Sequence, residues 1–422
     1  MIEAERVALR RRYAEERDKR LRLDGNDQYL ELKGPFSRML DDPYTPQSGR
    51  DPKRDHVTVA FVGGGFAGLV TGARLKKAGI GDVRIVEKGG GFGGTWYWNR
   101  YPGAQCDTEV TDLEWDASGR HWIVRTNRAD EFTARFVGIG TGPLHVAKLP
   151  GIPGIETFEG HAFHTSRWDY AYTGGDPDGA PMNRLAGQRV AIIGTGATSV
   201  LCKRPCFHDE YLSAYNLPSV HLVDTGGQGV ERITPAAVVV AGVEYPVDCI
   251  IYASSFEVGT EATRRYGFDM TGRDGTKLSD YWSGGMRSMH GVHVHGFPNA
   301  FHVQLWQGGN VIANVPHNLT DSAKTVAAVV SHMAGHGFDA VEVTREAEDA
   351  WMELLIPNPV MTSFLASCTP GYYNNEGHFD GQRFPLGGGY NQGAPAYFRY
   401  IGKWRASGDF ASWSSAASNP AA

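Results

Sequence analysis

Three glycines and one glutamate form the pattern in this sequence with the clearest chemistry. Gly63, Gly65 and Gly68 follow an apolar run at residues 57–62, and Glu87 ends a second apolar run about 20 residues further on. Between a strand and a helix, such glycines permit a tight turn, close approach of the backbone to a pyrophosphate, and close packing of the helix. The helix start offers N–H groups to phosphates, and the acid can accept both ribose hydroxyls. The pattern predicts a dinucleotide-binding site; a glycine-rich loop without a ligand is the alternative.

A string of aromatic residues and glycines follows at residues 93–104 and continues to Asp107. Gly94, Thr95 and Trp96 stand near its start. Rings at this density can flank an isoalloxazine ring and exclude water, which suits a flavin better than a nicotinamide. An aromatic cluster of the core is the alternative interpretation. We therefore expect the first dinucleotide to be FAD.

A third pattern consists of Phe158, Gly160, His164, Trp168 and Asp169, which fit the fingerprint F-x-G-x-x-x-H-x-x-x-W-(P/D). Together with the aromatic string, this fingerprint resembles that of Baeyer–Villiger monooxygenases, in the class B flavoprotein monooxygenase group. The resemblance covers nearly the whole chain, but two family segments are absent, one after the aromatic string and one in the second nucleotide fold. Taken alone, His164 is more typical of a structural histidine, and in the family its role resembles that of a linker between domains.

The resemblance implies an α/β fold with two Rossmann-like dinucleotide-binding domains, for FAD and NADPH, of which the second is truncated. That second domain starts with a strand and turn at residues 188–199. The resemblance assigns Gly194, Gly196 and Thr198 to NADPH and places Lys203 on its 2′-phosphate. In the first domain it assigns these residues to FAD: Gly63, Gly65, Gly68, Glu87, Gly94, Thr95, Trp96 and Asp107.

The implied reaction inserts one oxygen of O2 next to the carbonyl of a ketone, through a C4a-peroxyflavin, and gives an ester or a lactone. The anionic groups of such a reaction require a donor that stays charged, and arginine meets this requirement. By match to the family motif, Arg204 is that arginine and Asp107 is the carboxylate that orients it. A solvated basic pair, Lys203 with Arg204, is the alternative. A metal site at Cys202, Cys206 and His208 is not favoured, because the ligand spacing is unlike that of zinc sites.

Two other functions remain open because of the absent segments. One is a flavin-binding NADPH oxidase that releases hydrogen peroxide, and the other is an FAD-binding protein without turnover. The incomplete second domain favours both over a full monooxygenase cycle, whereas the intact first pattern is compatible with all three.

The expected layout follows from hydrophobic periodicity and turn residues. We expect an N-terminal helix and arm at residues 1–56, an FAD domain at 57–150 and 290–410, a shortened NADP domain at 151–289, and a frayed tail at 411–422. Helices are expected at 322–334 and 345–356, the second capped by Thr344, and another is expected to start at Gly308 and face the flavin pyrimidine. Expected strands lie at 57–62, 83–86, 110–115, 122–126, 132–139, 220–224, 238–240 and 245–254.

Composition sets the remaining bounds. The 422 residues carry a formal net charge of −6, which gives no reason to expect nucleic acid or an anionic membrane as a partner. The five cysteines are scattered and odd in number, which fits a reducing cytoplasm better than a disulfide framework. No apolar run approaches the roughly 18 residues that span a bilayer. We expect a cytoplasmic enzyme whose partners are a small ketone and O2; the sequence does not indicate an oligomeric state.

Overall fold

The computed structural model describes residues 3–45, 49–98, 109–176, 180–194, 211–309, 314–355, 363, 365–372, 374–378, 389–408, 410 and 413–417. The chain divides into two compact units. Unit 1 comprises Met1–Pro43, Ala147–Gly259 and Val360–Phe379, and unit 2 comprises Tyr44–Val146, Thr260–Pro359 and Asp380–Ala422. The chain thus leaves unit 2 close to the expected boundary at residue 150, but it returns at residue 260 rather than 290. Of the expected N-terminal segment, residues 1–43 belong to unit 1 and residues 44–56 to unit 2.

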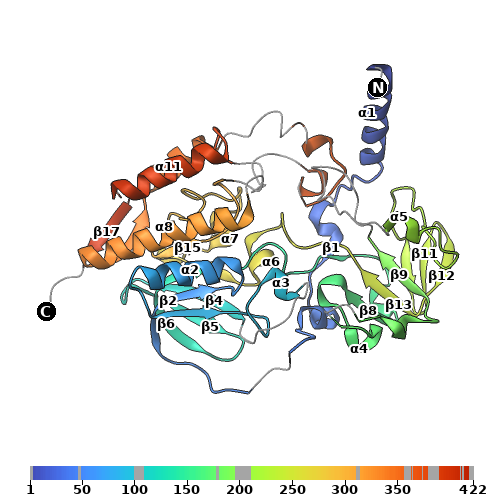
Figure 1. The fold of residues 1–422 in the computed structure, drawn as a ribbon, viewed down its shortest axis with the longest axis horizontal. Coiled ribbons are helices and arrows are strands. Elements are labelled where there is room, and N and C mark those ends of the chain that lie inside the picture. The colour runs from blue at the N-terminus through green and yellow to red at the C-terminus, as the bar shows by residue number, and fades with distance from the viewer. Residues whose placement is uncertain are drawn as a thin grey trace. The chain divides into compact units, whose positions relative to one another are not determined.

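Unit 2 is built on a mostly parallel sheet with the strand order β14-β4-β5-β6-β2-β3, and β15 pairs with β6 (Figure 1). The apolar strand β2 lies between β3 and β6 and is parallel to both, as expected for a buried central strand. The strands β4, β5 and β6 form an antiparallel meander, and a turn after Asp116 joins the first two. The strands are β2 His56–Val62, β3 Val83–Val86, β4 Val110–Asp116, β5 His121–Thr126, β6 Glu131–Ile139, β14 Asp269–Thr271 and β15 Ala300–His302.

Helices cover this sheet. Figure 1 shows α2 and α8 side by side over one face, and α2 buries Ala67, Thr71 and Leu75 at the spacing of one helix face. The predicted cap of α9 is confirmed, because Thr344 Oγ1 accepts a hydrogen bond from the Ala347 N–H at 3.2 Å. The helices of unit 2 are α2 Phe66–Lys77, α3 Thr95–Trp98, α6 Ala262–Tyr266, α7 Leu278–Tyr281, α8 Val315–His336, α9 Arg345–Glu353 and α11 Ala394–Ser407.

Two expectations for the second half of unit 2 are wrong. No helix starts at Gly308; α8 begins at Val315, where the side chain of Asn314 caps it, and it includes the expected helix at 322–334. The tail is not frayed over its whole length, because β17 Trp413–Ala417 pairs antiparallel with β16 Phe338–Val343. Backbone pairing with a distant strand leaves no trace in a short segment of small polar residues, which explains the second error.

The described residues of unit 1 form three small sheets. A parallel sheet has the order β8-β13-β9, an antiparallel sheet has the order β10-β11-β12, and β1 pairs with β7. The parallel sheet confirms that the second nucleotide fold is present in a reduced form. The strands are β1 Tyr29–Leu30, β7 Leu149–Pro150, β8 His161–His164, β9 Val190–Ile193, β10 Arg232–Thr234, β11 Ala237–Val240, β12 Val243–Pro246 and β13 Cys249–Tyr252, and the helices are α1 Glu3–Asp18, α4 Tyr170–Thr173 and α5 Tyr211–Ala214.

Two strand predictions in unit 1 are wrong. Residues 220–224 form no strand, and Leu222 within them is exposed, so its apolar side chain is not evidence of a sheet. The single strand expected at 245–254 is two strands, β12 and β13, which belong to different sheets. Pro246 ends the first of them, since proline cannot donate to a continuing ladder.

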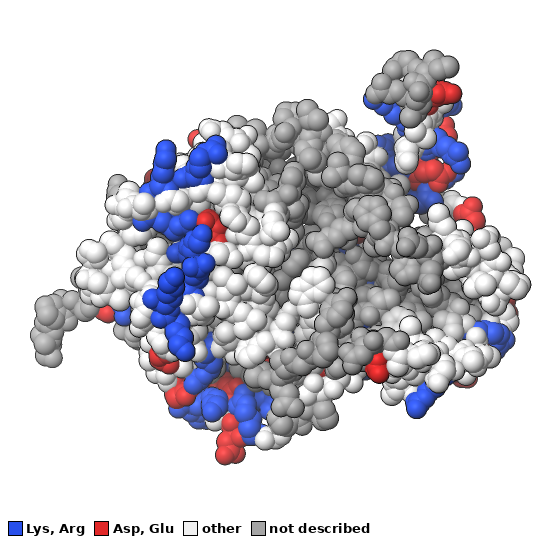
Figure 2. Space-filling model, viewed as in Figure 1, with Lys and Arg blue, Asp and Glu red and all other residues white. Residues whose placement is uncertain are grey.

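Several surface and side-chain features bear on function. In Figure 2, Lys and Arg side chains form a column over α11, α8 and α2. These three helices carry the exposed Lys76, Lys77, Lys324 and Lys403. Cys249 is a buried free thiol and Cys368 is disulfide-bonded, although the scattered cysteines gave no reason to expect a disulfide.

In the part of the chain that the structure describes, no helix has the length and apolar character needed to cross a bilayer. The same residues contain no cluster of three or more metal-ligating side chains.

His290, His293 and His302 are deeply buried in unit 2, and they make its stability sensitive to acid. Burial, with a smaller contribution from Arg405, lowers the pKa of His290 to about 3, and burial followed by Arg265 does the same for His302. The pKa of His293 also lies well below its ordinary value, chiefly through burial. The unfolded chain binds protons below about pH 6.5, whereas these folded histidines stay neutral, so stability is lost as the pH falls from 6.5 toward 3. We expect a loss of about 1.4 kcal/mol per pH unit for each such histidine, measured by urea denaturation at pH 7 and pH 5.

A matched pair of variants tests this assignment. His302→Gln should reduce the dependence of the unfolding free energy on pH, whereas His56→Gln, at an exposed histidine of the same unit, should leave it unchanged. If both variants kept the parent slope between pH 7 and pH 5, the buried histidines would not be its source.

Candidate cofactor site

The glycine turn after β2 has a backbone that other residues cannot adopt. Gly63 has φ of +105°, and a Cβ added there would lie 2.5 Å from the carbonyl oxygen of Gly140. A Cβ on Gly68 would collide with the carbonyl oxygen of Gly63, so this glycine allows α2 to pack against the turn. Two of the three roles predicted for these glycines, the tight turn and the close helix contact, are thus visible in the structure.

The start of α2 and the end of β3 converge beside this turn. The residue before α2 is Gly65, which has no side chain to cap the helix, so the N–H groups of its first turn remain available to a ligand. Glu87 is buried, and its two carboxylate oxygens accept hydrogen bonds from the Gly64 N–H at 2.5 Å and the Gly89 N–H at 2.9 Å. Burial raises the pKa of Glu87 above its ordinary value, while these backbone donors oppose that rise. The carboxylate is therefore held in one orientation.

The second glycine pair lies directly against the first. The Gly93 N–H donates to the carbonyl oxygen of Gly64 at 3.0 Å, and a Cβ on Gly94 would lie 2.8 Å from the Cα of Gly65. Only glycine permits two chain segments to approach so closely. The turn after β2 and the start of α3 thus form one continuous backbone surface.

The described part of the aromatic string contributes both to the core and to the wall of a pocket. Tyr97 and Trp98 are buried, with ring centroids 5.0 Å apart, and the Tyr97 hydroxyl is hydrogen-bonded to Thr45 at 3.0 Å. These two residues belong to the core. Trp96 is mostly exposed and lines the pocket described next. Trp96 and Trp98 of this helix thus both border the pocket, Trp98 from the core side.

A single pocket of unit 2 collects these parts. It is lined by the turn after β2, Glu87 and Lys88 after β3, the start of α3, and Gly140, Thr141 and Gly142 after β6. The opposite wall comes from the second half of the unit, from Arg265 and Tyr266 of α6 and from residues 303–306 after β15. Backbone N–H groups for phosphates, a buried acid for a ribose and an exposed ring for a flavin occur together here, so the residues fit FAD.

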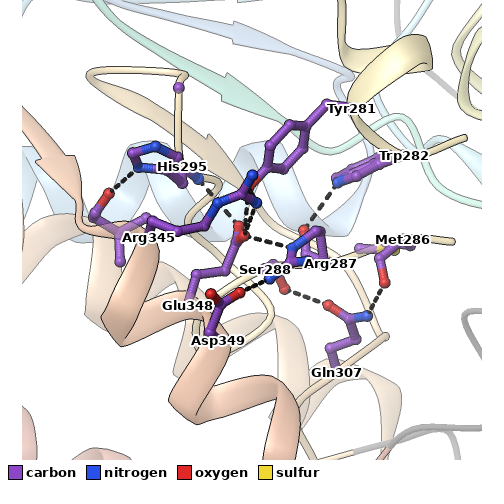
Figure 3. A network of polar contacts seen from close by, with 12 residues as sticks. Tyr281, Trp282, Met286, Arg287, Ser288, His295, Gln307, Arg345, Glu348 and Asp349 are labelled. Carbon is purple, nitrogen blue, oxygen red and sulfur yellow. Dashed lines mark hydrogen bonds and ion pairs between the residues drawn. The ribbon is translucent and has the colours of Figure 1, made fainter. Parts of the chain in front are cut away.

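A polar network holds the wall after β15 in place (Figure 3). The amide of Gln307 accepts from the Ser288 hydroxyl at 2.6 Å and donates to the carbonyl oxygen of Met286. Nearby, the buried carboxylate of Glu348 accepts from the Tyr281 hydroxyl at 2.5 Å and from Arg287 Nε at 2.7 Å. Because Gln307 follows the pocket residues 303–306 directly, this network fixes the backbone that lines the pocket.

The fingerprint residues are structural parts of unit 1. His164 ends β8, is buried, and shares a hydrogen bond of 2.8 Å between its Nδ1 and the Ser166 hydroxyl. Burial, followed by the charge of Arg167, lowers the pKa of His164 to about 4, so it is neutral near pH 7. Asp169 caps α4 through the Tyr172 N–H at 2.9 Å, which explains why an acid follows the tryptophan.

The other members of the fingerprint also pack. A Cβ on Gly160 would lie 2.6 Å from the carbonyl oxygen of Asp248, and Phe158 packs against the core of unit 1. Trp168 Nε1 donates to the Thr173 hydroxyl at 3.0 Å. All five fingerprint residues thus belong to the local structure around β8.

The second nucleotide turn is described only at its start. Gly194 follows β9 with φ of +110°, and a Cβ there would lie 2.5 Å from the carbonyl oxygen of Ala253, so the turn requires glycine. The remaining predicted residues of this site and the catalytic pair lie outside the described residues; they are Gly196, Thr198, Lys203, Arg204 and Asp107.

Sequence reasoning missed one wall of the pocket. Arg265, Tyr266 and Phe268 line it, although they were expected in the other domain. Their only sequence signal is a basic pair beside aromatics, Arg264 to Tyr266, which periodicity does not distinguish from a surface helix.

Comparisons with known proteins agree with this geometry. A family model described as an NAD(P)-binding Rossmann-like domain matches residues 62–122. The chain is 33% identical to neopentalenolactone D synthase of Streptomyces avermitilis, over 96% of this chain and 98% of that protein. It is 34% identical to a Baeyer–Villiger monooxygenase of Streptomyces coelicolor, over 94% and 95% of the two chains. A solved polycyclic ketone monooxygenase of Thermothelomyces thermophila has a TM-score of 0.86 and 25% identity, and the match covers 98% of this chain and 99% of that one.

The fold is thus that of a flavoprotein with two Rossmann-like dinucleotide-binding domains, and the chain belongs to the Baeyer–Villiger monooxygenase family. It is an FAD- and NADPH-dependent monooxygenase of ketones. The alignment with the Streptomyces avermitilis protein extends over 586 positions, whereas this chain has 422 residues. Well over a hundred aligned positions therefore have no residue in this chain, which agrees with the expected absence of family segments.

Proposed function

We propose that this enzyme converts a cyclic ketone to a lactone, with FAD bound in the pocket of unit 2 and NADPH bound at the Gly194 turn of unit 1. The observation that carries the proposal is the convergence of the glycine turn, the open start of α2 and the buried Glu87 carboxylate on one pocket. The cyclic substrate is supported by two names among the similar proteins, a lactone synthase and a polycyclic ketone monooxygenase.

The residues of unit 2 bind and orient FAD in this proposal. N–H groups of the turn at Gly63 and Gly65 and of the first turn of α2 bind the pyrophosphate, where the positive end of the helix dipole favours negative charge. Glu87 accepts the ribose hydroxyls, and Gly94, Thr95 and Trp96 border the flavin and exclude water. Once reduced by NADPH, FAD supplies the oxygen-transfer chemistry.

The residues assigned to NADPH are Gly194, Gly196 and Thr198 in the turn after β9, with Lys203 on the 2′-phosphate. The support is the parallel sheet of unit 1 and the requirement for glycine at the first of these positions. An enzyme that consumes NADPH needs a compartment that supplies it, so the proposal retains a cytoplasmic location.

Arg204→Ala should abolish lactone formation and leave reduction of the flavin by NADPH near the parent rate. In the proposal, Arg204 stabilises the negative charge that develops on the ketone oxygen, and Asp107 holds the guanidinium in place. Removing one such donor costs about a hundredfold or more in turnover. Stopped-flow bleaching of the flavin under anaerobic conditions and chromatography of the lactone measure the two steps. Lactone formation at the parent rate would show that Arg204 does not have this role.

The same assays separate the competing function. An NADPH oxidase would bleach and reoxidise but release hydrogen peroxide in place of lactone, and the many aligned positions without a residue here favour this candidate. Purified protein should be yellow, consume NADPH, and form lactone in proportion to a bicyclic ketone supplied. Peroxide released in an equal amount to the NADPH consumed, with no lactone, would establish the oxidase instead.

A further inference from the structure

Among the residues that the structure describes, Arg265 is a buried cation of the cofactor pocket for which no ion-pair partner is found. It lies in α6, is 5% exposed, and lines the pocket of unit 2. Its Nε atom is buried and has no hydrogen-bond partner. Across the residues that the structure describes, no carboxylate lies within ion-pair distance of its guanidinium group. Within the described part of the chain, this positive charge at the pocket wall therefore has no compensating acid.

Several other buried or half-buried cations of the described chain are paired with carboxylates. Arg405 contacts Asp321 at 2.7 Å, Arg287 contacts Glu348 at 2.7 Å, and the fully buried Lys148 contacts Glu376 at 2.7 Å. Proteins pair such charges because removing a lone charge from water is costly. Arg265 departs from this pattern, and a charge left unpaired in a pocket is more typical of a binding site than of a structural element.

The groups around Arg265 do not supply an anion. Its guanidinium carbon lies 5.5 Å from the ring centroid of Tyr266. The positive charge of Arg265 adds to the effect of burial in lowering the pKa of His302, so that imidazole is neutral. Two acids line the pocket. Glu87 is committed to two backbone N–H groups, and Glu109 pairs with Lys88 at 3.1 Å. The pocket thus offers Arg265 to a ligand that is negative or rich in electrons.

We infer that Arg265 is a binding residue for the dinucleotide, donating to an electron-rich oxygen of bound FAD. FAD has two such regions, the diphosphate and the pyrimidine edge of the flavin, and a planar guanidinium can serve either. The inference rests on the proposed assignment of this pocket to FAD. It adds a residue from the second half of unit 2 to a site otherwise built from the first half.

Arg265→Met tests the inference through binding and stability rather than turnover. In flavin-free protein, the substitution removes an uncompensated buried charge, so the melting temperature should stay the same or rise. The dissociation constant of FAD, measured by fluorescence quenching, should increase at least tenfold. Arg265→Lys keeps the charge without the planar fork, and its affinity should lie between those of the parent and Arg265→Met. A purely structural arginine predicts the opposite: a lower melting temperature with unchanged affinity per folded molecule, which would overturn the inference.

Two further measurements locate the contact. If ADP also binds more weakly to Arg265→Met, Arg265 contacts the diphosphate half. If ADP binds as before but the reduction potential of bound flavin shifts to a more negative value, it contacts the flavin half, because a nearby positive charge stabilises the reduced flavin. Either result supports the inference.

Arg264→Met is the matched control, because Arg264 precedes Arg265 in α6 and does not line the pocket. Its FAD affinity should equal that of the parent. Equal affinities of the parent and Arg265→Met for both FAD and ADP, with no change in potential, would overturn the role of Arg265 alone. A parent protein that fails to bind FAD would overturn the pocket assignment as well.

Discussion

Replacing Glu87 by glutamine is expected to weaken FAD binding about a hundredfold. Both carboxylate oxygens accept backbone N–H groups, from Gly64 and Gly89. Glutamine has a single acceptor oxygen, so its NH2 group must face one of those donors, and the group presented to the ribose loses its charge. Hydrogen bonds to a charged acceptor contribute about 1.5–3 kcal/mol each. A loss of about 2.7 kcal/mol of binding free energy corresponds to an affinity about a hundredfold lower. Titration of flavin-free protein with FAD, followed by fluorescence, measures the change.

The pH dependence of binding gives a second test of Glu87. Because burial raises the pKa of this carboxyl, falling pH protonates it earlier than an exposed glutamate and removes acceptor capacity. FAD affinity of the parent should therefore fall as the pH decreases toward that raised pKa, whereas Glu87→Gln should show no such decline. Asp82→Asn is the control, since Asp82 accepts from the Thr58 N–H at 2.7 Å in the same strand–helix–strand unit but does not line the pocket. Parent-like affinity of Glu87→Gln at all pH values would remove Glu87 from the site.

The part of the site around Glu87 could be predicted because all of its determinants are local. The apolar run of β2, the glycine spacing and the acid after β3 lie within one strand–helix–strand unit, and the observed bounds differ from the predicted ones by a residue at most. Local patterns of this kind report backbone requirements directly, as the positive φ of Gly63 shows. The meander of β4, β5 and β6 was predictable for the same reason, from alternation and a turn sequence.

Several of the errors involve partners that are distant in sequence. Residues 220–224 are apolar enough for a strand but form none. Residues 413–417 are mostly small and polar, yet they form β17 and pair with β16. The start of α8 was placed at Gly308, although Asn314 provides the side-chain cap and Gln307 is held by a network from elsewhere in the unit. Arg265 could not be predicted for the same reason, because its place in the pocket depends on strands and turns distant in sequence and not on its own neighbours in the chain.

Lys148→Met is expected to lower the free energy of unfolding by about 3–5 kcal/mol. Lys148 is 1% exposed, and its Nζ contacts Glu376 Oε1 at 2.7 Å and Asn26 Oδ1 at 2.9 Å, 4.1 Å from the ring centroid of Tyr29. Three segments of unit 1 that are distant in sequence thus meet at one ammonium group. Methionine fills the volume of the lysine stem but leaves the carboxylate of Glu376 buried without a counter-charge, and that desolvated anion is the source of the loss. Urea denaturation of flavin-free protein measures it without the stabilisation that bound FAD would add.

The double variant Lys148→Met with Glu376→Gln separates charge from packing. The glutamine side chain is neutral and can still accept from the Tyr29 hydroxyl, which donates to Glu376 in the parent at 3.3 Å, so most of the lost stability should return. Arg189→Met breaks an exposed ion pair of the same unit, with Asp248, and should leave the unfolding midpoint where it is in the parent. If the double variant were as unstable as Lys148→Met, the loss would arise from packing around the lysine stem, and the buried ion pair would not be what holds these three segments together.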